Sequence, residues 1–353
     1  MARNGKKTVA VIAGDGIGPE VVRVGVGVLE RLIELRGYPI EIVPLDVGAE
    51  RYLRDGTSWP PAIARFVREQ CDAVLLGALG DPRVPDLGYA RDILFGLRQG
   101  LDLYCNIRPV VCLHDRLMPL RGRRAADCNF VVFRENTEGI YAGIGGTLRR
   151  DGIDEIAINE DVNTRRGVER IVRAAFDWAR RHGKRRVHMA DKSNAMPHAH
   201  GLWHRCFFEV AADYPDIEAR HLYIDALCYE LVRDPSPFEV IVTCNLFGDI
   251  VTDLGAALQG GLGMAASANV HPGRVSMFEP VHGSAPPLAG RDLANPFATV
   301  LSVGMMLSHL GWPEEEVRLV ELVRNAIEAG RCTPDVGGSL GTRAAGEALI
   351  AAL

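Results

Sequence analysis

Two aspartates four residues apart, Asp249 and Asp253, carry the clearest chemical signal in the chain. They lie in TCNLFGDIVTDLGAAL (243–258), where an apparent helix would point both carboxylates from one face. These like charges repel, and no cationic residue within four positions of Asp249 offsets them. Asp225, at the end of the strand-like HLYID, could complete a set of oxygen ligands. Such a set suits Mg²⁺ or Mn²⁺ rather than zinc, and a solvated helix face is the alternative.

Lysine is rare in this chain: four lysines stand among its 40 cationic residues. One of them, Lys192, follows the strand-like RRVHM in the segment MADKSNAMPH. A desolvated lysine can lose its proton, whereas arginine in practice cannot. We therefore expect Lys192 to transfer protons; a lysine placed there by chance is the alternative.

Three arginines lie near the ends of expected elements, Arg98 and Arg108 in LRQGLDLYCNIRP (97–109) and Arg134 after FVVF. Any one of them alone is more simply a solvated surface charge, because arginine is so common in this chain. If all three converge, their guanidinium groups would bind two or more carboxylates in a bidentate manner. That arrangement predicts a small substrate with several carboxylates.

Two glycine- or proline-rich segments could approach a cofactor. GDGIGPE (14–20) joins an expected strand to an expected helix, but its spacing is not G-x-G-x-x-G, which disfavours a Rossmann dinucleotide site. EPVHGSAPPLAGRDLANP (279–296) has four prolines and no regular period, and so long a loop is usually functional. The side chains and small residues in it that could contact a heterocycle are His282, Gly283, Ser284, Ala285 and Asn295.

The elements that must position these residues alternate along the chain. Apolar β-branched runs predict strands at 8–14, 40–45, 73–77, 129–133, 186–190, 219–224 and 240–243. Helical periodicity predicts helices at 19–36, 165–182 and 198–212, with Pro19 in a first turn. This order is typical of an α/β protein with parallel strands.

Composition narrows the class of protein. The 353 residues carry a net charge of −5, which argues against a general nucleic-acid binder. No apolar run reaches the roughly 20 residues that a membrane span needs, and the N-terminus lacks a signal-peptide pattern. Eight scattered cysteines without a CxxC pair indicate a reduced protein. We expect a cytoplasmic protein that binds neither membranes nor nucleic acid.

These segments, in this order, resemble the β-decarboxylating dehydrogenases, which include 3-isopropylmalate, isocitrate, homoisocitrate and D-malate/tartrate dehydrogenases. The likeness runs from GDGIGPE to TPDVGGSLGT (333–342). Its most specific pieces are LRQGLDLYCNIRP, RENTEGIYAG (134–143), NLFGDIVTD (245–253) and EPVHGSAP (279–286).

The resemblance implies a two-domain α/β fold of the isopropylmalate/isocitrate dehydrogenase type, which is not a Rossmann fold. Its interleaved domains would be residues 1–105 plus 265–353, with the cofactor loop and both termini, and residues 106–264, with the metal ligands. It also implies a homodimer whose two active sites share residues across the interface.

Carried over residue by residue, the resemblance also implies roles in oxidative decarboxylation. Lys192 would accept the hydroxyl proton, through Asp225 or a water, and Tyr141 would protonate the carbon that loses CO₂. Lys192 and Asp225 would come from the partner subunit. The malate carboxylates would be bound by Arg98, Arg108 and Arg134, and Mg²⁺ or Mn²⁺ by Asp225, Asp249 and Asp253.

For the cofactor, the resemblance implies that the loop from His282 to Asn295 carries the adenine end and that Asn194 contacts the nicotinamide side. NAD enzymes of the family generally have an acidic residue after GSAP, and NADP enzymes tend to have a Lys-Tyr pair. This chain has Pro287 and Leu288 there, which supply neither. Because no cation at these two positions would receive a 2′-phosphate, we predict NAD.

Substrate choice in the family depends largely on the segment YARDILFGLR (89–98). Leu94 and Phe95 keep the apolar pair that isopropylmalate enzymes place against the isopropyl group, so we expect 3-isopropylmalate or a close relative. Arg91 stands where those enzymes have glutamate; it is either a solvated charge or a contact to an additional anionic group, as in homoisocitrate. D-malate or tartrate, isocitrate-type substrates and a non-catalytic regulatory subunit of the same fold remain the alternatives.

Overall fold

The computed structural model describes residues 5–353, which form two compact units. Of the described residues, the first unit comprises 5–103, Cys112–Pro119 and Ala256–Leu353. The second unit comprises Tyr104–Val111 and Leu120–Gly255. Each unit has its own set of hydrogen-bonded strands and its own hydrophobic core.

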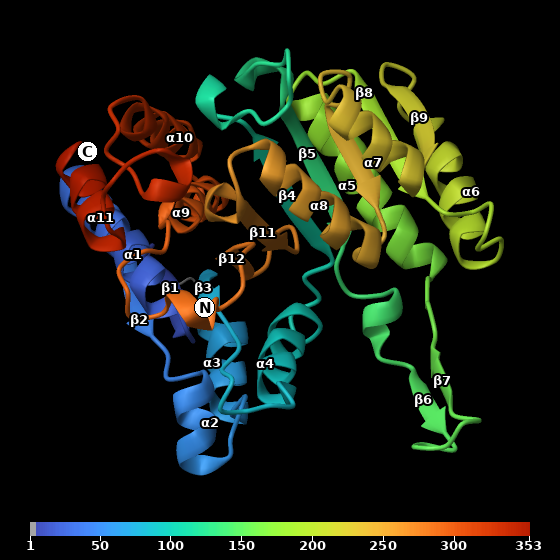
Figure 1. Cartoon of the computed structure of the whole chain (residues 1–353), viewed down its shortest axis with the longest axis horizontal. Coiled ribbons are helices and arrows are strands. Elements are labelled where there is room, and N and C mark those ends of the chain that lie inside the picture. The colour runs from blue at the N-terminus through green and yellow to red at the C-terminus, as the bar shows by residue number, and fades with distance from the viewer. Residues whose placement is uncertain (1–4) are drawn as a thin grey trace. The chain divides into compact units, whose positions relative to one another are not determined.

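The sheet of the first unit has the strand order β2-β1-β3-β12-β11 (Figure 1). Neighbouring strands are parallel except for β11, which runs antiparallel to β12. The inner strands β1 and β3 are apolar runs buried on both faces, as parallel strands under two layers of helices must be. The strands are β1 (Lys7–Gly14), β2 (Ile40–Pro44), β3 (Ala73–Ala78), β11 (Ala266–Val270) and β12 (Ser276–Pro280).

Helices cover both faces of this first sheet. Helices α1 and α9 pack against one face, and α2, α3 and α4 share a core cluster with the other. Helix α1 begins with Pro19 in its first turn and ends at Gly37, whose φ of 69° suits a residue without a Cβ. The helices are α1 (Gly18–Arg36), α2 (Ala49–Asp55), α3 (Pro61–Gln70), α4 (Gly88–Arg98), α9 (Phe297–Leu310), α10 (Pro313–Glu328) and α11 (Thr342–Ala351).

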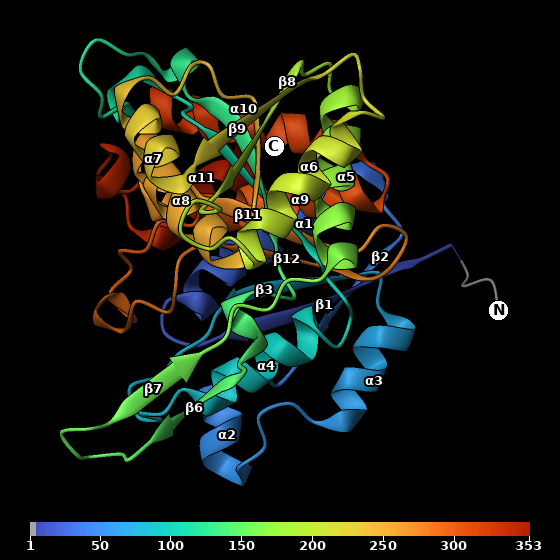
Figure 2. The ribbon, with the colours of Figure 1, turned by 90° about the vertical axis from the view of Figure 1, so that its right-hand side faces the viewer.

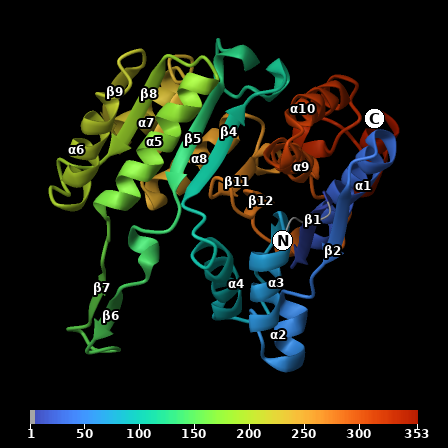
Figure 3. The ribbon, with the colours of Figure 1, turned by 180° about the vertical axis from the view of Figure 1, so that it is seen from behind.

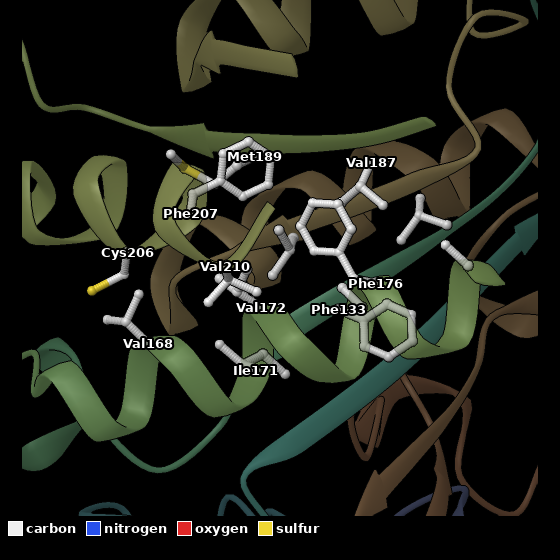
Figure 4. Packing of buried hydrophobic residues seen from close by; sticks show 14 of the residues in the cluster. Phe133, Val168, Ile171, Val172, Phe176, Val187, Met189, Cys206, Phe207 and Val210 are labelled. Carbon is white, nitrogen blue, oxygen red and sulfur yellow. The ribbon is translucent and has the colours of Figure 1, made fainter. Parts of the chain in front are cut away.

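The sheet of the second unit has the order β4-β5-β10-β8-β9, in which only β4 runs antiparallel to its neighbour. Helix α5 crosses the strands on one face and α7 lies on the other, as Figures 1 and 3 show from opposite sides. Figure 4 shows Phe176 of α5 and Phe207 of α6 packed with strand residues such as Met189. The strands are β4 (Cys105–Val111), β5 (Asn129–Glu135), β8 (Arg186–Asp191), β9 (Glu218–Tyr223) and β10 (Val240–Thr243); the helices are α5 (Arg165–Arg181), α6 (Ala199–Ala211), α7 (Ile224–Arg233) and α8 (Asn245–Leu258).

A two-stranded hairpin, β6 (Gly145–Leu148) and β7 (Ile156–Asn159), projects from the second unit (Figure 2). It carries a group of exposed apolar side chains, which is unusual on the surface of a monomer. These side chains are Ile144, Leu148, Ile153, Ile156 and Ile158. The sequence did not predict this hairpin.

The seven strands predicted from apolar runs are confirmed, and so are the three predicted helices. All seven strands belong to the parallel parts of the two sheets. The strands that were not predicted, β4, β11, β12 and the hairpin, are antiparallel or carry polar residues, so they do not form continuous apolar runs. Within the described residues, no helix is both long and apolar enough to span a membrane.

Candidate active site

Asp249 of α8 is the centre of a polar cluster in the second unit. Its Oδ1 accepts hydrogen bonds from Arg134 Nη1 at 2.5 Å and from Arg108 Nη1 at 3.3 Å. Its Oδ2 accepts a hydrogen bond from the Tyr141 hydroxyl at 3.1 Å. The charge of Asp249 is therefore offset by residues far outside the four positions on either side that the sequence argument considered. The two arginines come from β4 and β5, far from Asp249 in the chain.

Both arginines are held before any substrate arrives. The Arg134 side chain is 2% exposed, and its Nε and Nη2 both donate to Asn245 Oδ1, at 3.0 and 2.7 Å. Arg108 donates from Nη1 to the Thr252 hydroxyl at 2.6 Å. Gly248 makes room for Arg134, because a Cβ there would lie 2.5 Å from Arg134 Cγ. Asn245 and Thr252 belong to the site although the sequence did not single them out.

Asp253 lies one turn beyond Asp249 on α8, as the spacing predicted. Burial raises the pKa of the Asp253 carboxyl, and the negative charge of Asp249 raises it further. Two carboxylates that destabilise each other's charge are relieved by a divalent cation, so the donor set fits Mg²⁺ or Mn²⁺. The two aspartates therefore supply the carboxylate oxygens that Mg²⁺ or Mn²⁺ prefers as ligands.

Asp225 does not join that pair within one chain. Among residues 5–353, the group of three or more metal-ligating side chains whose ligand atoms all lie within 4.8 Å of one another consists of Glu169, Cys206 and Glu209. Both of those glutamates are ion-paired with Arg165, so their charge is already compensated. The aspartate set of one chain is thus split between α7 and α8.

Lys192 and Asp225 meet at the ends of β8 and β9. Lys192 Nζ donates to Asp225 Oδ1 at 2.5 Å, and this hydrogen bond holds the pKa of the Asp225 carboxyl below its usual range. Behind them, the buried Asp191 Oδ1 lies 2.9 Å from His221 Nε2. His200 Nδ1 accepts from the Lys192 backbone N–H at 2.9 Å. These supporting residues were not predicted, although each stands in or beside a segment that was.

In the first unit, Arg98 ends α4 and donates from Nη2 to Glu279 Oε1 at 2.9 Å. Asn269 donates to the same oxygen at 2.8 Å. Glu279 opens the EPVHGSAP segment but was not singled out as a site residue. Leu94 and Phe95 are half-buried, and Arg91 is exposed on the same helical face as Arg98.

The loop after β12 lies on the GDGIGPE turn of the first unit. The Ile17 N–H donates to the Ser284 carbonyl at 2.9 Å. Gly16 permits this approach, because its φ is 58° and a Cβ would lie 2.0 Å from the Ser284 carbonyl oxygen. The glycines of GDGIGPE thus seat the cofactor loop against the first turn of α1, which fits the poor match to a dinucleotide fingerprint.

His282 is the residue of this loop that best fits a ligand. It is buried, its Nε2 has no hydrogen-bond partner among the described residues, and burial lowers its pKa. A neutral imidazole with an unpartnered ring nitrogen could bind a heterocycle, and a side chain at the neighbouring Gly283 would meet nothing within 4 Å. The loop therefore fits the adenine end of a dinucleotide.

Unlike His282, the other two predicted cofactor contacts are either hydrogen-bonded at both ends or exposed. Asn295 Nδ2 donates to Asp335 Oδ2 at 2.9 Å, and its Oδ1 accepts from the Phe297 N–H at 3.0 Å, so both ends of the amide are engaged. Asn194 is exposed in the turn after Lys192. Arg291 Nη1 donates to the Pro287 carbonyl at 3.3 Å. A guanidinium therefore lies beside Pro287, a position at which the sequence itself has no cationic residue.

The structure thus gathers Arg108, Arg134, Tyr141 and Asp249 in the second unit, with Asp253 one helical turn away. It pairs Lys192 with Asp225 in the same unit. Arg98 on α4 and the loop from His282 to Asn295 belong to the first unit. Each group presents charge or hydrogen-bonding capacity suited to a small acidic ligand or to a nucleotide.

Comparisons with known proteins agree with this set of groups. The family model described as isocitrate/isopropylmalate dehydrogenase matches residues 8–349. The 3-isopropylmalate dehydrogenase of Frankia casuarinae is 45% identical over 347 residues, which cover 96% of this chain and 99% of that protein. The 3-isopropylmalate dehydrogenase of Thermobifida fusca is 43% identical over 344 residues, covering 95% and 97%.

A solved structure, the isocitrate dehydrogenase from Methylococcus capsulatus, is similar to this chain with a TM-score of 0.88 at 37% identity, over 98% of each chain. This similarity confirms the expected fold class, an α/β fold of the isopropylmalate/isocitrate dehydrogenase type. The family match spans nearly all of the described residues, including both arginine strands, α8 and the cofactor loop. The chain therefore belongs to the isocitrate/isopropylmalate dehydrogenase family of oxidoreductases.

Proposed function

We propose that this protein catalyses the NAD-dependent and divalent-metal-dependent oxidative decarboxylation of a 3-substituted malate, with 3-isopropylmalate as the first candidate. The observation that carries the proposal is the cluster at Asp249, where two buried arginines and a tyrosine hydroxyl meet one carboxylate beside a second one. Relatives over 40% identical along nearly the whole chain are named 3-isopropylmalate dehydrogenases, which supports this choice of substrate.

Arg98, Arg108 and Arg134 would bind the carboxylates of the malate moiety. The two buried arginines are suited to this task because Asn245 and Thr252 already orient their guanidinium groups. Binding to oriented donors costs little side-chain entropy. Arg98 would act from the first unit, where Glu279 orients it.

Lys192 and Tyr141 would move the two protons that the reaction needs. The hydroxyl proton of the substrate would pass to Lys192 through Asp225, which Lys192 contacts at 2.5 Å, or through a water. Tyr141 would protonate the carbon that loses CO₂. The Arg134 guanidinium carbon stands 5.5 Å from the Tyr141 ring centroid, so a positive charge lies near the tyrosine that gives up its proton.

Asp225, Asp249 and Asp253 would hold Mg²⁺ or Mn²⁺, with Lys192 and Asp225 supplied by the partner subunit. The metal, when bound, would act as a Lewis acid toward the substrate oxygens. Supply of Asp225 by a partner accords with its separation from Asp249 and Asp253 within one chain.

A homodimer is part of this proposal. The exposed apolar side chains of the β6–β7 hairpin support it, because they form a surface that a second copy could cover. Helices α7 and α8 add Tyr229, Val232 and Ile250, each at least half exposed. The aspartates to be shared lie on these same two helices.

NAD would bind along the loop from His282 to Asn295, with Asn194 on the nicotinamide side. The unpartnered Nε2 of His282 supports the assignment of this loop. Arg291 beside Pro287 makes NADP the control cofactor of first importance.

A second candidate substrate is supported by Arg91. Its guanidinium has no ion-pair partner among the described residues, and it lies two helical turns before Arg98 on the same face. A free cation there suits a substrate with a third anionic group, as in homoisocitrate. D-malate or tartrate, which lack a large C3 group, would use the same arginines.

The test is NADH or NADPH production with Mn²⁺ or Mg²⁺ across 3-isopropylmalate, D-malate, tartrate, isocitrate and homoisocitrate. We expect one substituted malate to give the highest kcat/KM with NAD, and EDTA to abolish turnover. Lys192→Met should reduce kcat by at least about 10³-fold, whereas Lys184→Met, a matched change of a half-buried lysine far from these groups, should leave it unchanged. No turnover of any acid by folded, metal-loaded wild type would favour the regulatory-subunit alternative.

A further inference from the structure

Helix α4 carries two stripes of side chains on opposite faces. Tyr89, Asp92 and Gly96 follow the spacing i, i+3, i+7, and so do Arg91, Leu94 and Arg98. Because each residue advances by about 100° around the helix, the two stripes lie roughly opposite each other. The second stripe contains the proposed substrate contacts. The contacts made by the first stripe therefore determine the position of the second stripe, which would face the substrate.

The first stripe is anchored to neighbouring segments of the same unit at its first two positions. The Tyr89 hydroxyl donates to Asp15 Oδ2 at 2.7 Å, and its ring stacks on Tyr52 at 5.4 Å between centroids. One turn later, Asp92 Oδ2 accepts from the Ser58 hydroxyl at 3.0 Å. These contacts fix α4 to the GDGIGPE turn, to α2 and to the segment between α2 and α3.

The third position, Gly96, lies against the indole of Trp59. A Cβ on Gly96 would lie 2.4 Å from Trp59 Cδ1 and 2.5 Å from Nε1, far inside van der Waals contact. Glycine in a helix interior costs about 1 kcal/mol relative to alanine. The close approach of Trp59 explains why glycine stands at this position. The backbone of α4 thus rests directly on the indole.

Trp59 is poorly able to move away from α4. Its side chain is half-buried and packs against the core cluster of the first unit, as Leu94 also does. Ser58 before it is held by Asp92, and Pro60 and Pro61 after it have fixed φ angles. A side chain added at Gly96 would therefore displace α4 rather than the indole. Ordinary contact at 3.4 Å requires a shift of about 1 Å from the 2.4 Å approach.

We propose that Trp59 is a positioning residue for substrate specificity: it sets how far α4 stands from the α2–α3 segment, and so how closely Leu94 and Arg91 approach the C3 substituent of the substrate. The inference rests on the proposed function, because it assigns α4 to the C3 substituent. It adds a residue that touches neither substrate nor cofactor. A shift of about 1 Å in a positioned group changes rates and affinities by up to about 10²-fold.

The experiment is a double-mutant cycle with Gly96→Ala, Trp59→Ala and the double variant. The ratio of KM for D-malate to KM for 3-isopropylmalate is measured for each, together with kcat and Tm. Binding of both acids to metal-loaded protein is measured by calorimetry, so that selectivity can be read even without turnover. Gly201→Ala is the matched control, because a Cβ at this helical glycine of α6 meets only Arg205 Nη1, at 3.6 Å.

We expect Gly96→Ala to change the KM ratio at least about 10-fold, with kcat within about 3-fold of wild type. In the Trp59→Ala background the same change should alter the ratio less than about 2-fold, because the methyl group then fills the space that the indole leaves. Gly201→Ala should leave the ratio unchanged. Trp59→Ala alone tests the inference if Gly96→Ala does not fold, since it should also change the ratio.

Three results would overturn the inference. In one of them, the wild type is active, and Gly96→Ala and Trp59→Ala are coupled in Tm but not in the KM ratio. The contact would then be purely structural. Another is an equal change in KM for both acids. The third is a wild type that binds neither acid, which would remove the proposed function as well. If the protein shows no turnover but the two substitutions are still coupled in the binding selectivity, only the proposed reaction is removed.

Discussion

The two units hold the arginines that we propose to bind the substrate in different ways. In the second unit, Arg108 and Arg134 extend from paired strands, are 5% and 2% exposed, and converge on Asp249. In the first unit, Arg98 ends a helix, is 18% exposed and has Glu279 as its carboxylate partner. Strand-borne arginines locked by Asn245 and Thr252 suit the part of the substrate that never varies. Helix α4 is held by hydrogen bonds from Tyr89 and to Asp92 and by the contact of Gly96 with an indole. Substitutions at these contacts can shift the helix, which suits the part proposed to vary.

Of the substitutions that test this difference between the two units, Arg134→Gln should have the largest effect. It removes a buried charge that compensates Asp249 and leaves Asn245 without its donors. Arg134 is 2% exposed but the Asp249 side chain is 40% exposed, so water can solvate part of the charge left behind and the cost should stay below the about 3–5 kcal/mol of a fully buried pair. We expect a fall in Tm and a loss in kcat/KM of at least about 10³-fold. The check is thermal unfolding together with the substrate panel. Arg173→Gln, which breaks an exposed pair with Asp213, should change the free energy of unfolding by at most about 1 kcal/mol; equal effects of the two variants would contradict the contrast.

His188 of β8 extends the comparison to a buried base in the second unit. Burial, reinforced by the nearby Arg220 and Arg186, lowers its pKa from 6.5 to about 4. Between these pH values the unfolded chain binds the proton and the folded chain does not, so stability falls as pH decreases from about 6.5 to 4. The loss from this residue should approach about 3 kcal/mol.

Urea unfolding of wild type and His188→Gln between pH 7.5 and 4 measures this contribution as the difference in slope. The variant should lose part of the decline in unfolding free energy. His198→Gln, a change at an exposed histidine, should keep the wild-type slope. A His188→Gln curve parallel to wild type would show that His188 is not the group responsible.

Arg98→Gln should have a smaller effect than Arg134→Gln. The Arg98 side chain is 18% exposed, and Asn269 still donates to Glu279 Oε1 in the variant, so we expect a smaller fall in Tm. Loss of a charged hydrogen bond to the substrate should raise KM about 10–100-fold, with a smaller change in kcat. Steady-state kinetics and a melting curve on the same preparation check both parts. A fall in Tm as large as that of Arg134→Gln would mean that the two units do not differ in this respect.

Arg91→Ala should have the smallest and most selective effect. Its side chain is exposed, so stability should stay within about 0.5 kcal/mol of wild type. If Arg91 binds a third anionic group, KM should rise several-fold for homoisocitrate and remain unchanged for D-malate and 3-isopropylmalate. An equal rise for all three acids would exclude a selective contact, and no rise for any of them would leave Arg91 as a solvated charge.

The predicted strands illustrate which part of a fold local sequence determines. Apolar runs such as 8–14 and 73–77 predict buried parallel strands because burial on both faces leaves no polar position. The strand Ser276–Pro280 was missed because its buried positions include Ser276 and Glu279, whose partners come from elsewhere in the chain. The hairpin was missed because its apolar side chains face outward rather than into the core of its own chain.

By itself, the sequence determined the fold class, the α/β alternation and the residue types available for chemistry, because hydrophobic periodicity and short motifs are local properties. Only the tertiary structure decided which groups meet. Arg108 and Asp249 are 141 residues apart, and their contact depends on how β4 packs beside α8. The counter-ions of Asp249 could not be found among its sequence neighbours for the same reason: they come from strands far away in the chain. The contact of Gly96 with Trp59 is equally invisible in the sequence, because only packing determines what occupies the space where a Cβ would stand.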